Sequence, residues 1–394
     1  MYIDLTPEQY ALRDHLREYF ARMMTPELQA EIAGSAAEGG GPLYRKALRQ
    51  MGTDGWLGIG WPKQYGGQDR SAIEQFIFSD EVQRAGFPLP FLTINSIGPT
   101  IFENGTEEQK RKYLNPILAG ELHFAIGYTE PTSGTDLASL RTRAVRDGDE
   151  WVINGSKVFT SLAEYSDYIW LAARTDPNAP KHKGISIFIV DTKSPGYKCT
   201  PIHTMAGVRT NATFYDDVRV PASALVGREN EGWWLITSQL NRERIALSAA
   251  GPLERTIEDV RRWAIQTRLA DGRRVIDQEW VQIKLAHVRA KWEVLKLLNW
   301  RQAWCMANGS LNFADASTVK VFASEYYVEA YRELMEIIGQ PGYLKTGSAD
   351  AVLRGRLEFV YRATLILTFG GGTNEIQRDI IAMAGLQMPR SLRG

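Results

Sequence analysis

The sequence predicts an α+β fold in three parts, because the spacing of apolar residues changes twice along its 394 positions. Up to residue 121 apolar residues recur every three or four positions, which is the helical period. Between 122 and 231 the pattern favours short strands, and from 232 to 394 the helical period returns. Because the strands follow one another without helices between them, we expect a middle antiparallel barrel or sandwich rather than a βαβ sheet.

The N-terminal part, residues 1–121, carries clear helix-start signals. Residues 6–9 read Thr-Pro-Glu-Gln, a capping box with proline at the first helical position, and apolar side chains follow at four-residue intervals from Leu12 to Phe20. The same kind of signal at 106–109 predicts a further short helix that ends near Gly120. We therefore predict a helical N-terminal domain.

The middle part, residues 122–231, reads as strands and turns. Asn154-Gly155 stands between two β-prone runs and predicts a tight hairpin turn. Three further runs are expected to form strands, at 168–172, 184–190 and 212–220.

The C-terminal part, residues 232–394, shows apolar residues at three- and four-residue spacing, with Gly, Asn and Asp between the segments. Helical segments are predicted near 233–268, 278–307, 315–339, 350–368 and 374–385.

Composition excludes several classes of protein. Lys and Arg total 46 and Asp and Glu total 46, so the chain lacks the positive charge expected of a nucleic-acid-binding protein. No apolar run approaches the length of about 20 residues that spans a bilayer, and the N-terminus does not resemble a signal peptide. The two cysteines, Cys199 and Cys305, suit a reducing compartment. We expect a cytoplasmic protein with no membrane span.

Motifs of other enzyme classes are missing. The five histidines are far apart and no HExxH or CxxC occurs, so no metal site is expected. Serine-hydrolase elbows and phosphate-binding loops are also missing. The run at 370–375, Gly-Gly-Gly-Thr-Asn-Glu, does not follow a strand in a βαβ unit, which argues against a Rossmann dehydrogenase.

Two segments carry a family resemblance. Residues 128–136, Tyr-Thr-Glu-Pro-Thr-Ser-Gly-Thr-Asp, resemble the TEPxxGSD signature of acyl-CoA dehydrogenases, and 373–378, Thr-Asn-Glu-Ile-Gln-Arg, resemble the C-terminal signature of that family. Residues 153–157 and the turn from Val226 to Gly232 extend the similarity over nearly the whole chain. The resemblance implies FAD held between the β domain and a C-terminal four-helix bundle, and α,β-dehydrogenation of an acyl-CoA.

The resemblance also implies the residues that contact the cofactor. Ile126, Tyr128 and Thr129 are expected to line the isoalloxazine ring. Phe159 takes the place of a family tryptophan beside that ring, and Ser161 the place of a threonine near N5. Aromatic residues in a strand are more often ordinary core, but their position beside the 128–136 signature favours cofactor contact.

Three further positions follow from the matching signatures. Thr373 and Glu375 are expected to contact the cofactor, and Thr135 to lie near the CoA phosphopantetheine, where the family has a serine.

The catalytic base is displaced in this sequence. Most members place a glutamate just before Gly-Thr in the C-terminal signature, where this chain has Gly371. A minority, resembling isovaleryl- and long-chain acyl-CoA dehydrogenases, carry it on a helix, and Glu243 occupies that position. A carboxylate suits the task because burial under substrate raises its pKa toward the working pH. The alternative is that 242–244 is only a solvated, charged turn of helix.

The resemblance assigns the substrate contacts around this base. Arg244 matches a substrate arginine, and Asn241 replaces an aspartate that contacts the CoA arm. The backbone N–H near Gly371 is expected to bond the thioester oxygen. Glycines at 370–372 also remove side chains from the active-site wall, which suits a bulky acyl group.

Two departures from the family concern the subunits. Family homotetramers bind the FAD diphosphate and adenosine with motifs from a neighbouring subunit, and here Asp271 and Glu336 place acids in those motifs. The pattern resembles actinobacterial α2β2 heterotetramers that act on steroid side chains, with this chain as the base-bearing subunit. The resemblance then implies β-oxidation of a steroid acyl-CoA in cholesterol catabolism, with electrons passed to an electron-transferring flavoprotein.

Two alternative functions remain open. The same fold serves acyl-CoA oxidases and flavin monooxygenases, which oxygen consumption without another acceptor would reveal. The chain could also be a non-catalytic subunit that supports a catalytic partner, although Glu243 argues against that.

Overall fold

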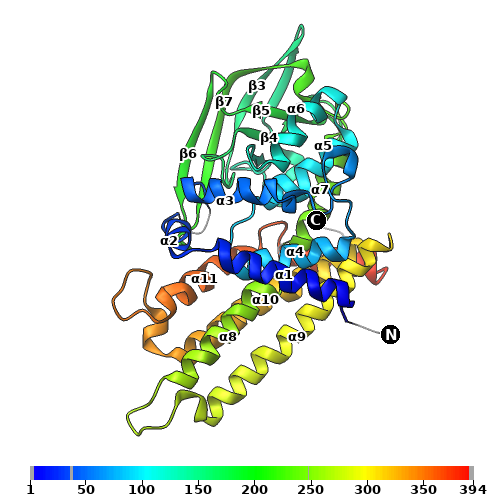
Figure 1. Cartoon of the computed structure of the whole chain (residues 1–394). Helices are drawn as coiled ribbons and strands as arrows, with labels where there is room; N and C mark the ends of the chain where they lie inside the picture. Colours follow the sequence, from blue (N-terminus) through cyan, green and yellow to red (C-terminus); the bar gives the residue numbers. More distant parts are fainter. Residues whose placement is uncertain (1–3, 36–38, 247, 390–394) are drawn as a thin grey trace.

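A computed structural model describes residues 4–35, 39–246 and 248–389, and within 240–246 it describes the backbone only. Figure 1 shows three layers: the β domain lies at one end with the last N-terminal helices beside it, the other N-terminal helices cross the middle, and the long C-terminal helices form the other end. This arrangement confirms the predicted α+β fold with helical N- and C-terminal parts and a sheet between them.

The N-terminal helices begin at the predicted capping signals. Thr6 and Gln9 form a complete capping box at the start of α1, and Thr106 and Gln109 form another at the start of α6. Both predictions are confirmed. The helices are α1 (Pro7–Met23), α2 (Pro26–Gly34), α3 (Pro42–Thr53), α4 (Ala72–Ala85), α5 (Gly98–Asn104) and α6 (Glu107–Leu118), with a π-helical turn η3 (Leu92–Ile97) before α5.

The middle domain is one sheet of eight strands in which most pairs are antiparallel. Its main path runs β6-β7-β3-β2-β4-β5-β8, and β1 pairs with β4 in parallel. That parallel pair is possible because β2 and β3 lie between β1 and β4 in the chain and provide a long connection. The strands are β1 (Phe124–Gly127), β2 (Arg143–Asp147), β3 (Glu150–Lys157), β4 (Tyr168–Arg174), β5 (Ile185–Asp191), β6 (Tyr197–His203), β7 (Arg209–Pro221) and β8 (Leu225–Val226).

The predicted hairpin turn at Asn154-Gly155 is wrong. Both residues lie inside β3, where the register against β7 shifts in a bulge between Ile153 and Gly155. The Asn154 side chain bonds Asp217 on β7, with Nδ2 donating to Oδ1 over 2.9 Å and Oδ1 accepting from the backbone N–H over 3.0 Å. A side chain at 155 would lie 2.5 Å from Thr142 Oγ1, so glycine is needed there for close packing rather than for a turn.

Two predicted C-terminal segments are divided in the structure. Segment 233–268 becomes α7 (Gly232–Ala246) and α8 (Gly251–Gln266), and Pro252 stands in the first turn of α8. Segment 350–368 is α-helical only in α11 (Arg356–Thr364). The predictions for α9 (Glu279–Ala307), α10 (Phe313–Ile338) and α12 (Asn374–Ile380) are confirmed.

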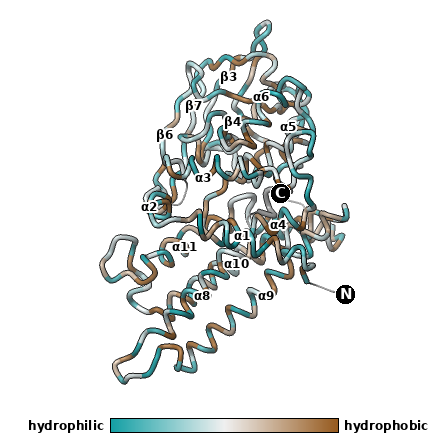
Figure 2. The backbone as a smooth tube through the Cα atoms, in the orientation of Figure 1, coloured by the Kyte–Doolittle hydropathy of each residue, from teal (hydrophilic) through white to brown (hydrophobic). Residues whose placement is uncertain are grey.

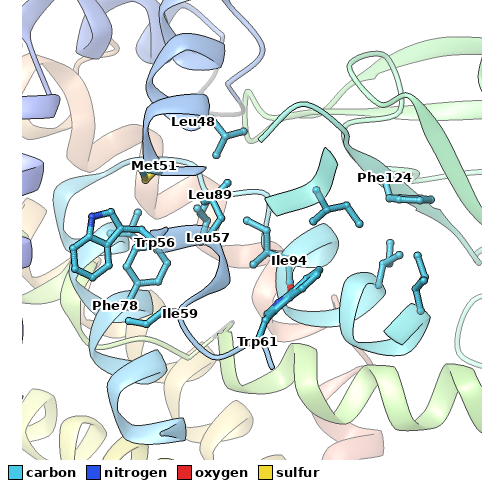
Figure 3. Packing of buried hydrophobic residues seen from close by; sticks show 14 of the residues in the cluster. Leu48, Met51, Trp56, Leu57, Ile59, Trp61, Phe78, Leu89, Ile94 and Phe124 are labelled. Atoms are coloured by element: carbon cyan, nitrogen blue, oxygen red, sulfur yellow. The ribbon is translucent and has the colours of Figure 1, made fainter. Parts of the chain in front are cut away.

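The largest apolar core joins the N-terminal helices to β1 and α7. Trp56 stacks on Phe78 with ring centroids 6.2 Å apart, and the buried Trp61 donates its indole N–H to the carbonyl oxygen of Ile94 over 3.0 Å (Figure 3). Figure 2 shows hydrophobic and hydrophilic residues alternating along α8 and α9, the pattern of helices that are buried on one side only. Among the described residues, no helix is long and apolar enough to cross a bilayer.

Ionic contacts join the N-terminal helices to the C-terminal bundle. Arg17 contacts Glu81 at 2.9 Å and Glu254 of α8 at 3.3 Å. The Asp80 carboxylate accepts the backbone N–H of Gly251, at the start of α8, over 2.7 Å. Burial is the largest influence on Asp80 and raises its pKa to about 7.

Candidate active site

A buried ion pair joins the loop after β1 to the end of β3. Lys157 Nζ lies 2.8 Å from Glu130 Oε1, with no exposed Lys157 side-chain surface and 5% exposure for Glu130. Glu130 also accepts the backbone N–H groups of Arg141 and Thr142 over 2.7 and 2.8 Å, and Lys157 donates to the carbonyl oxygen of Tyr128 over 3.0 Å.

This network determines the charge of both groups. Burial lowers the pKa of Lys157 to about 8, and Glu130 opposes that shift. Burial acts to raise the pKa of Glu130, but the Lys157 charge and the hydrogen bonds hold it below the usual value. The pair holds the loop after β1 against the end of β3.

Tyr128 connects β1 to α7. Its hydroxyl donates to Gln239 Oε1 over 2.5 Å and accepts the indole N–H of Trp170 over 3.1 Å. Gln239 is buried, and its Nε2 has no hydrogen-bond partner in the described part of the chain. Since Gln239 stands one helical turn before Glu243, this contact holds the helix of the predicted base against the predicted flavin strand.

The loop after β3 presents an aromatic side chain in an unusual backbone conformation. Phe159 has a φ of 58° and is 62% exposed. The flanking residues are held in place, because Val158 donates its backbone N–H to Thr129 over 2.9 Å and Thr160 donates to Asn211 over 2.9 Å. A left-handed aromatic residue costs about 1–3 kcal/mol, and such strain is concentrated at functional sites. The loop therefore displays the Phe159 ring instead of burying it.

Hydroxyl groups lie next to this ring in the sequence. Ser161 is exposed and its Oγ lies 3.4 Å from Thr210 Oγ1. Thr129 and Ile126 are half-buried, and Ile126 lies on the same side of β1 as Tyr128 because side chains alternate along a strand. A planar cofactor with polar edges fits this mixture of apolar surface and hydroxyl groups.

The C-terminal signature forms a loop that α10 supports. Gly371 and Gly372 have φ angles of 68° and 96°. The buried Lys320 ammonium donates to the Gly372 carbonyl over 2.8 Å and to the Asn374 side chain over 2.7 Å. A side chain at 372 would lie 2.6 Å from Gln377 Nε2. Lys320 of α10 therefore stabilises the loop backbone, and the glycines add no side chains to the loop.

Thr373 and Glu375 lie at the start of α12. The Thr373 hydroxyl caps the helix by accepting the backbone N–H of Ile376 over 3.3 Å. Glu375 is exposed, and backbone and Thr373 hydrogen bonds lower its pKa. These contacts give Thr373 a structural task at the predicted cofactor edge.

Three predicted residues lie on α7 beyond the part whose side chains are described. The backbone of Asn241, Glu243 and Arg244 is helical, as predicted, and their side chains lie outside the described part of the structure. Helix α10, which supports the C-terminal loop, also packs against α7.

The predicted CoA contact, Thr135, is exposed in the loop after β1. Beside it, the buried Ser133 hydroxyl donates to the Asp136 carbonyl over 2.9 Å, and the Asp136 carboxylate contacts Lys181 at 2.7 Å. The loop is thus stabilised internally and leaves Thr135 accessible.

The two unexpected acids each have a cation within the same chain. Asp271 lies 2.7 Å from Arg273, which lowers the pKa of the carboxyl group. Glu336 lies 2.6 Å from Lys284 of α9. Each acid therefore forms an ion pair with a basic side chain of its own chain.

The structure adds residues that sequence reasoning missed. Gln239, Lys320 and Gln377 all contact predicted site segments. Gln239 could have been found from its place one turn before Glu243, whereas nothing in the local sequence distinguishes Lys320.

Tertiary structure also brings His287, Glu329 and Glu333 within 4.8 Å of one another, although no metal site was expected from the sequence. Lys291 lies 2.6 Å from Glu329, and His287 lies 3.1 Å from Glu333.

The three-part fold agrees with comparisons to known proteins. Models of the acyl-CoA dehydrogenase N-terminal, middle and C-terminal domains match residues 6–121, 125–218 and 230–386. The chain belongs to the acyl-CoA dehydrogenase family and is an enzyme of that class.

Particular relatives are very similar over their whole length. The chain is 55% identical to acyl-CoA dehydrogenase FadE26 of Mycobacterium tuberculosis, covering 100% of both chains. It is 50% identical to FadE29 of the same organism, covering 99% of both.

Two solved structures are equally similar. One chain in the crystal structure of the ChsE4-ChsE5 complex from Mycobacterium tuberculosis has a TM-score of 0.93 at 56% identity, covering 99% of this chain and 100% of that one. The structure described as the Tcur3481-Tcur3483 steroid ACAD has a TM-score of 0.93 at 50% identity, with 99% and 100% coverage.

Proposed function

We propose that this chain is an FAD-dependent acyl-CoA dehydrogenase that oxidises a bulky acyl-CoA, of the steroid side-chain class, to the trans-2-enoyl-CoA. Glu243 takes the α proton, and FAD, when bound, accepts the β hydrogen as hydride. The Tyr128–Gln239 hydrogen bond carries this proposal, because it joins the flavin strand to the helix of Glu243 one turn before the base.

The remaining residues bind and orient the reactants. The Phe159 ring and the Thr129 and Ser161 hydroxyl groups hold the flavin, with Ile126, Thr373 and Glu375 at its edges. Arg244, Asn241 and Thr135 hold the CoA arm, and the backbone N–H near Gly371 bonds the thioester oxygen.

The substrate class is supported by two independent observations. The loop at 370–372 has no side chains, so the wall that carries a glutamate in most members leaves room for a large acyl group. The similar Tcur3481-Tcur3483 structure is described as a steroid ACAD.

We further propose an α2β2 assembly with a second acyl-CoA dehydrogenase-like chain that supplies the missing FAD contacts. Both similar structures are described by pairs of proteins. Helix α9 also exposes large apolar side chains at helical spacing that fit a partner helix, namely Trp280, Ile283, Val294, Leu297 and Trp304. We define these five residues as the α9 stripe.

Replacement of the base tests the catalytic assignment. Glu243→Gln should bind flavin normally and prevent its reduction by acyl-CoA, because the amide cannot accept the α proton. Glu229→Gln, at an exposed position before α7, is the matched control and should react normally. Normal flavin reduction by Glu243→Gln would contradict the assignment.

The assembly is tested by the ratio of flavin to chain. We expect little flavin in the chain purified alone and about one flavin per base-bearing site after co-expression with its partner. A full complement of flavin in the isolated chain would indicate a homotetramer.

Rapid reoxidation by an electron-transferring flavoprotein, with slow oxygen consumption, would distinguish the dehydrogenase from an oxidase or monooxygenase.

A further inference from the structure

A pocket of about 150 Å³, partly open to the surface, lies between the N-terminal domain and the β domain. Apolar side chains from three segments form most of its wall, including Phe91, Leu92, Phe124 and Leu162. His123 and Arg45 add polar groups to the same wall. A cavity of this size is comparable to one that holds a single benzene-sized ring.

Two residues of the pocket wall are close in the sequence to predicted residues of the candidate active site. Phe124 precedes Ile126 by two residues on the same side of β1, and Leu162 directly follows Ser161. At about 3.3 Å per extended residue, Phe124 lies about 13 Å from Tyr128, the residue that follows β1. The pocket is therefore close enough to receive the far end of an acyl group whose reacting carbons lie beside α7.

The wall segment that contains Leu92 and Thr93, the π-helical turn η3, packs against β1 and α7. The Thr93 hydroxyl of η3 accepts the backbone N–H of Phe124 over 3.0 Å and donates to its carbonyl oxygen over 3.3 Å. These bonds hold the η3 part of the pocket wall against β1.

His123 is the polar side chain at the β1 end of the pocket. Burial lowers its pKa, with Asp167 opposing the shift and Arg45 and Arg49 adding to it. A neutral imidazole offers one N–H donor and one acceptor. Its Nδ1 has no hydrogen-bond partner in the described part of the chain, so this nitrogen is available to a bound group. The ring can adapt to either a donor or an acceptor.

We propose that this pocket receives the terminal ring of the acyl group and that His123 hydrogen-bonds an oxygen substituent, a ketone or a hydroxyl, on that ring. The inference rests on the proposed function, and it assigns to His123 a part in substrate specificity. The apolar wall accounts for recognition of the ring, and the single imidazole accounts for recognition of its oxygen.

The test compares two acyl-CoA substrates that share a fused ring system and differ only in the terminal oxygen. The complete complex should oxidise the oxygen-bearing substrate with a kcat/KM about 10-fold higher, which is the usual effect of one neutral hydrogen bond. His123→Phe should abolish this preference while straight-chain acyl-CoA is oxidised normally, and His123→Gln should keep part of it. A ketone and a hydroxyl on the same ring are tested separately to identify the oxygen.

A second variant tests the pocket without altering the histidine. Leu92→Trp should fill the cavity and weaken binding of the ring-bearing enoyl-CoA product about 10-fold or more in equilibrium titration, with straight-chain product unaffected. Leu43→Trp, on the exposed side of α3 and outside the pocket wall, is the matched control.

The inference is overturned if the wild-type complex shows no preference for the oxygen, or if His123→Phe retains the preference. It is also overturned if Leu92→Trp affects ring-bearing and straight-chain products equally. These results are distinct from failure of the proposed function, which would appear as normal flavin reduction by Glu243→Gln.

Discussion

Lys157 and Glu130 form a buried ion pair with 2.8 Å between Nζ and Oε1, although 27 residues separate them in the sequence. Glu130 belongs to the 128–136 signature and Lys157 ends the 153–157 motif. Two motifs that look independent in the sequence are thus one structural unit. Tyr128 and Phe159, two aromatic residues expected at the flavin, lie two residues from Glu130 and Lys157, respectively, in the sequence.

Removal of the Lys157 charge should destabilise the protein strongly. Lys157→Met leaves the Glu130 carboxylate buried without its cation, and we expect a loss of about 3–5 kcal/mol in the free energy of unfolding, measured in urea. Lys181→Met removes a similar but exposed contact to Asp136 and should cost at most about 1 kcal/mol. Equal effects from the two variants would show that burial adds nothing to this pair.

Asp80 should make stability depend on pH. Its pKa is raised from 3.8 to about 7, so the folded protein binds the proton more tightly than the unfolded chain does. The contribution of Asp80 to the free energy of unfolding is therefore greatest below about pH 4. It decreases by up to about 4 kcal/mol as the pH rises to about 7.

Replacement of Asp80 checks the sign of this effect. Asp80→Asn keeps an oxygen that can accept the Gly251 N–H but cannot ionise, so the fall in unfolding free energy between pH 4 and 7 should be smaller. The exposed Asp14→Asn is the control. An unchanged slope in Asp80→Asn would contradict the assignment.

The glycine loop should tolerate no side chain at 372. Gly372→Ala combines the cost of a positive φ with a contact of 2.6 Å to Gln377 Nε2. Gly347→Ala has a similar φ of 92° and no atom within 4 Å, so it carries the backbone cost alone. We expect Gly347→Ala to lose about 1 kcal/mol of stability, and Gly372→Ala to lose more and to slow flavin reduction. Identical stability losses and normal kinetics would show that Gln377 moves aside without consequence.

A charge on the α9 stripe should weaken assembly. Ile283 is 60% exposed, and Ile283→Glu would place an unpaired carboxylate in the proposed contact with the partner chain. Sedimentation of the co-expressed complex should show dissociation at concentrations where the wild type stays assembled. Gln282→Glu, on a different exposed side of α9, should not affect assembly. A stable Ile283→Glu complex would exclude this stripe as the interface.

The sequence predicts the segments that carry the candidate site because their signals are local. The backbone around Phe159 and Gly371 lies in or beside short motifs, and Glu243 lies in a segment that the sequence predicts as helical. Contacts between distant segments were not accessible. Lys320 is one lysine among many in the sequence, and only the packing of α10 against α12 makes it the support of the glycine loop.

The prediction at Asn154-Gly155 failed for a related reason. The dipeptide is typical of a hairpin turn, but the propensity for such a turn is weak against the gain from pairing with β7. Asp217 accepts the Asn154 amide and Thr142 needs the space at Gly155, so tertiary contacts decided the backbone conformation there.

By itself, the sequence determined the order of helical and β parts, the helix starts at Thr6 and Thr106, and the family. These properties depend on residues close together in the chain, whose periodicity and hydrogen bonding are local. The tertiary structure decided the Lys157–Glu130 pair, the Tyr128–Gln239 contact between β1 and α7, and the pocket beside His123. Such features arise when burial removes water from groups far apart in the chain, so each charged or polar group must find its partner across the fold.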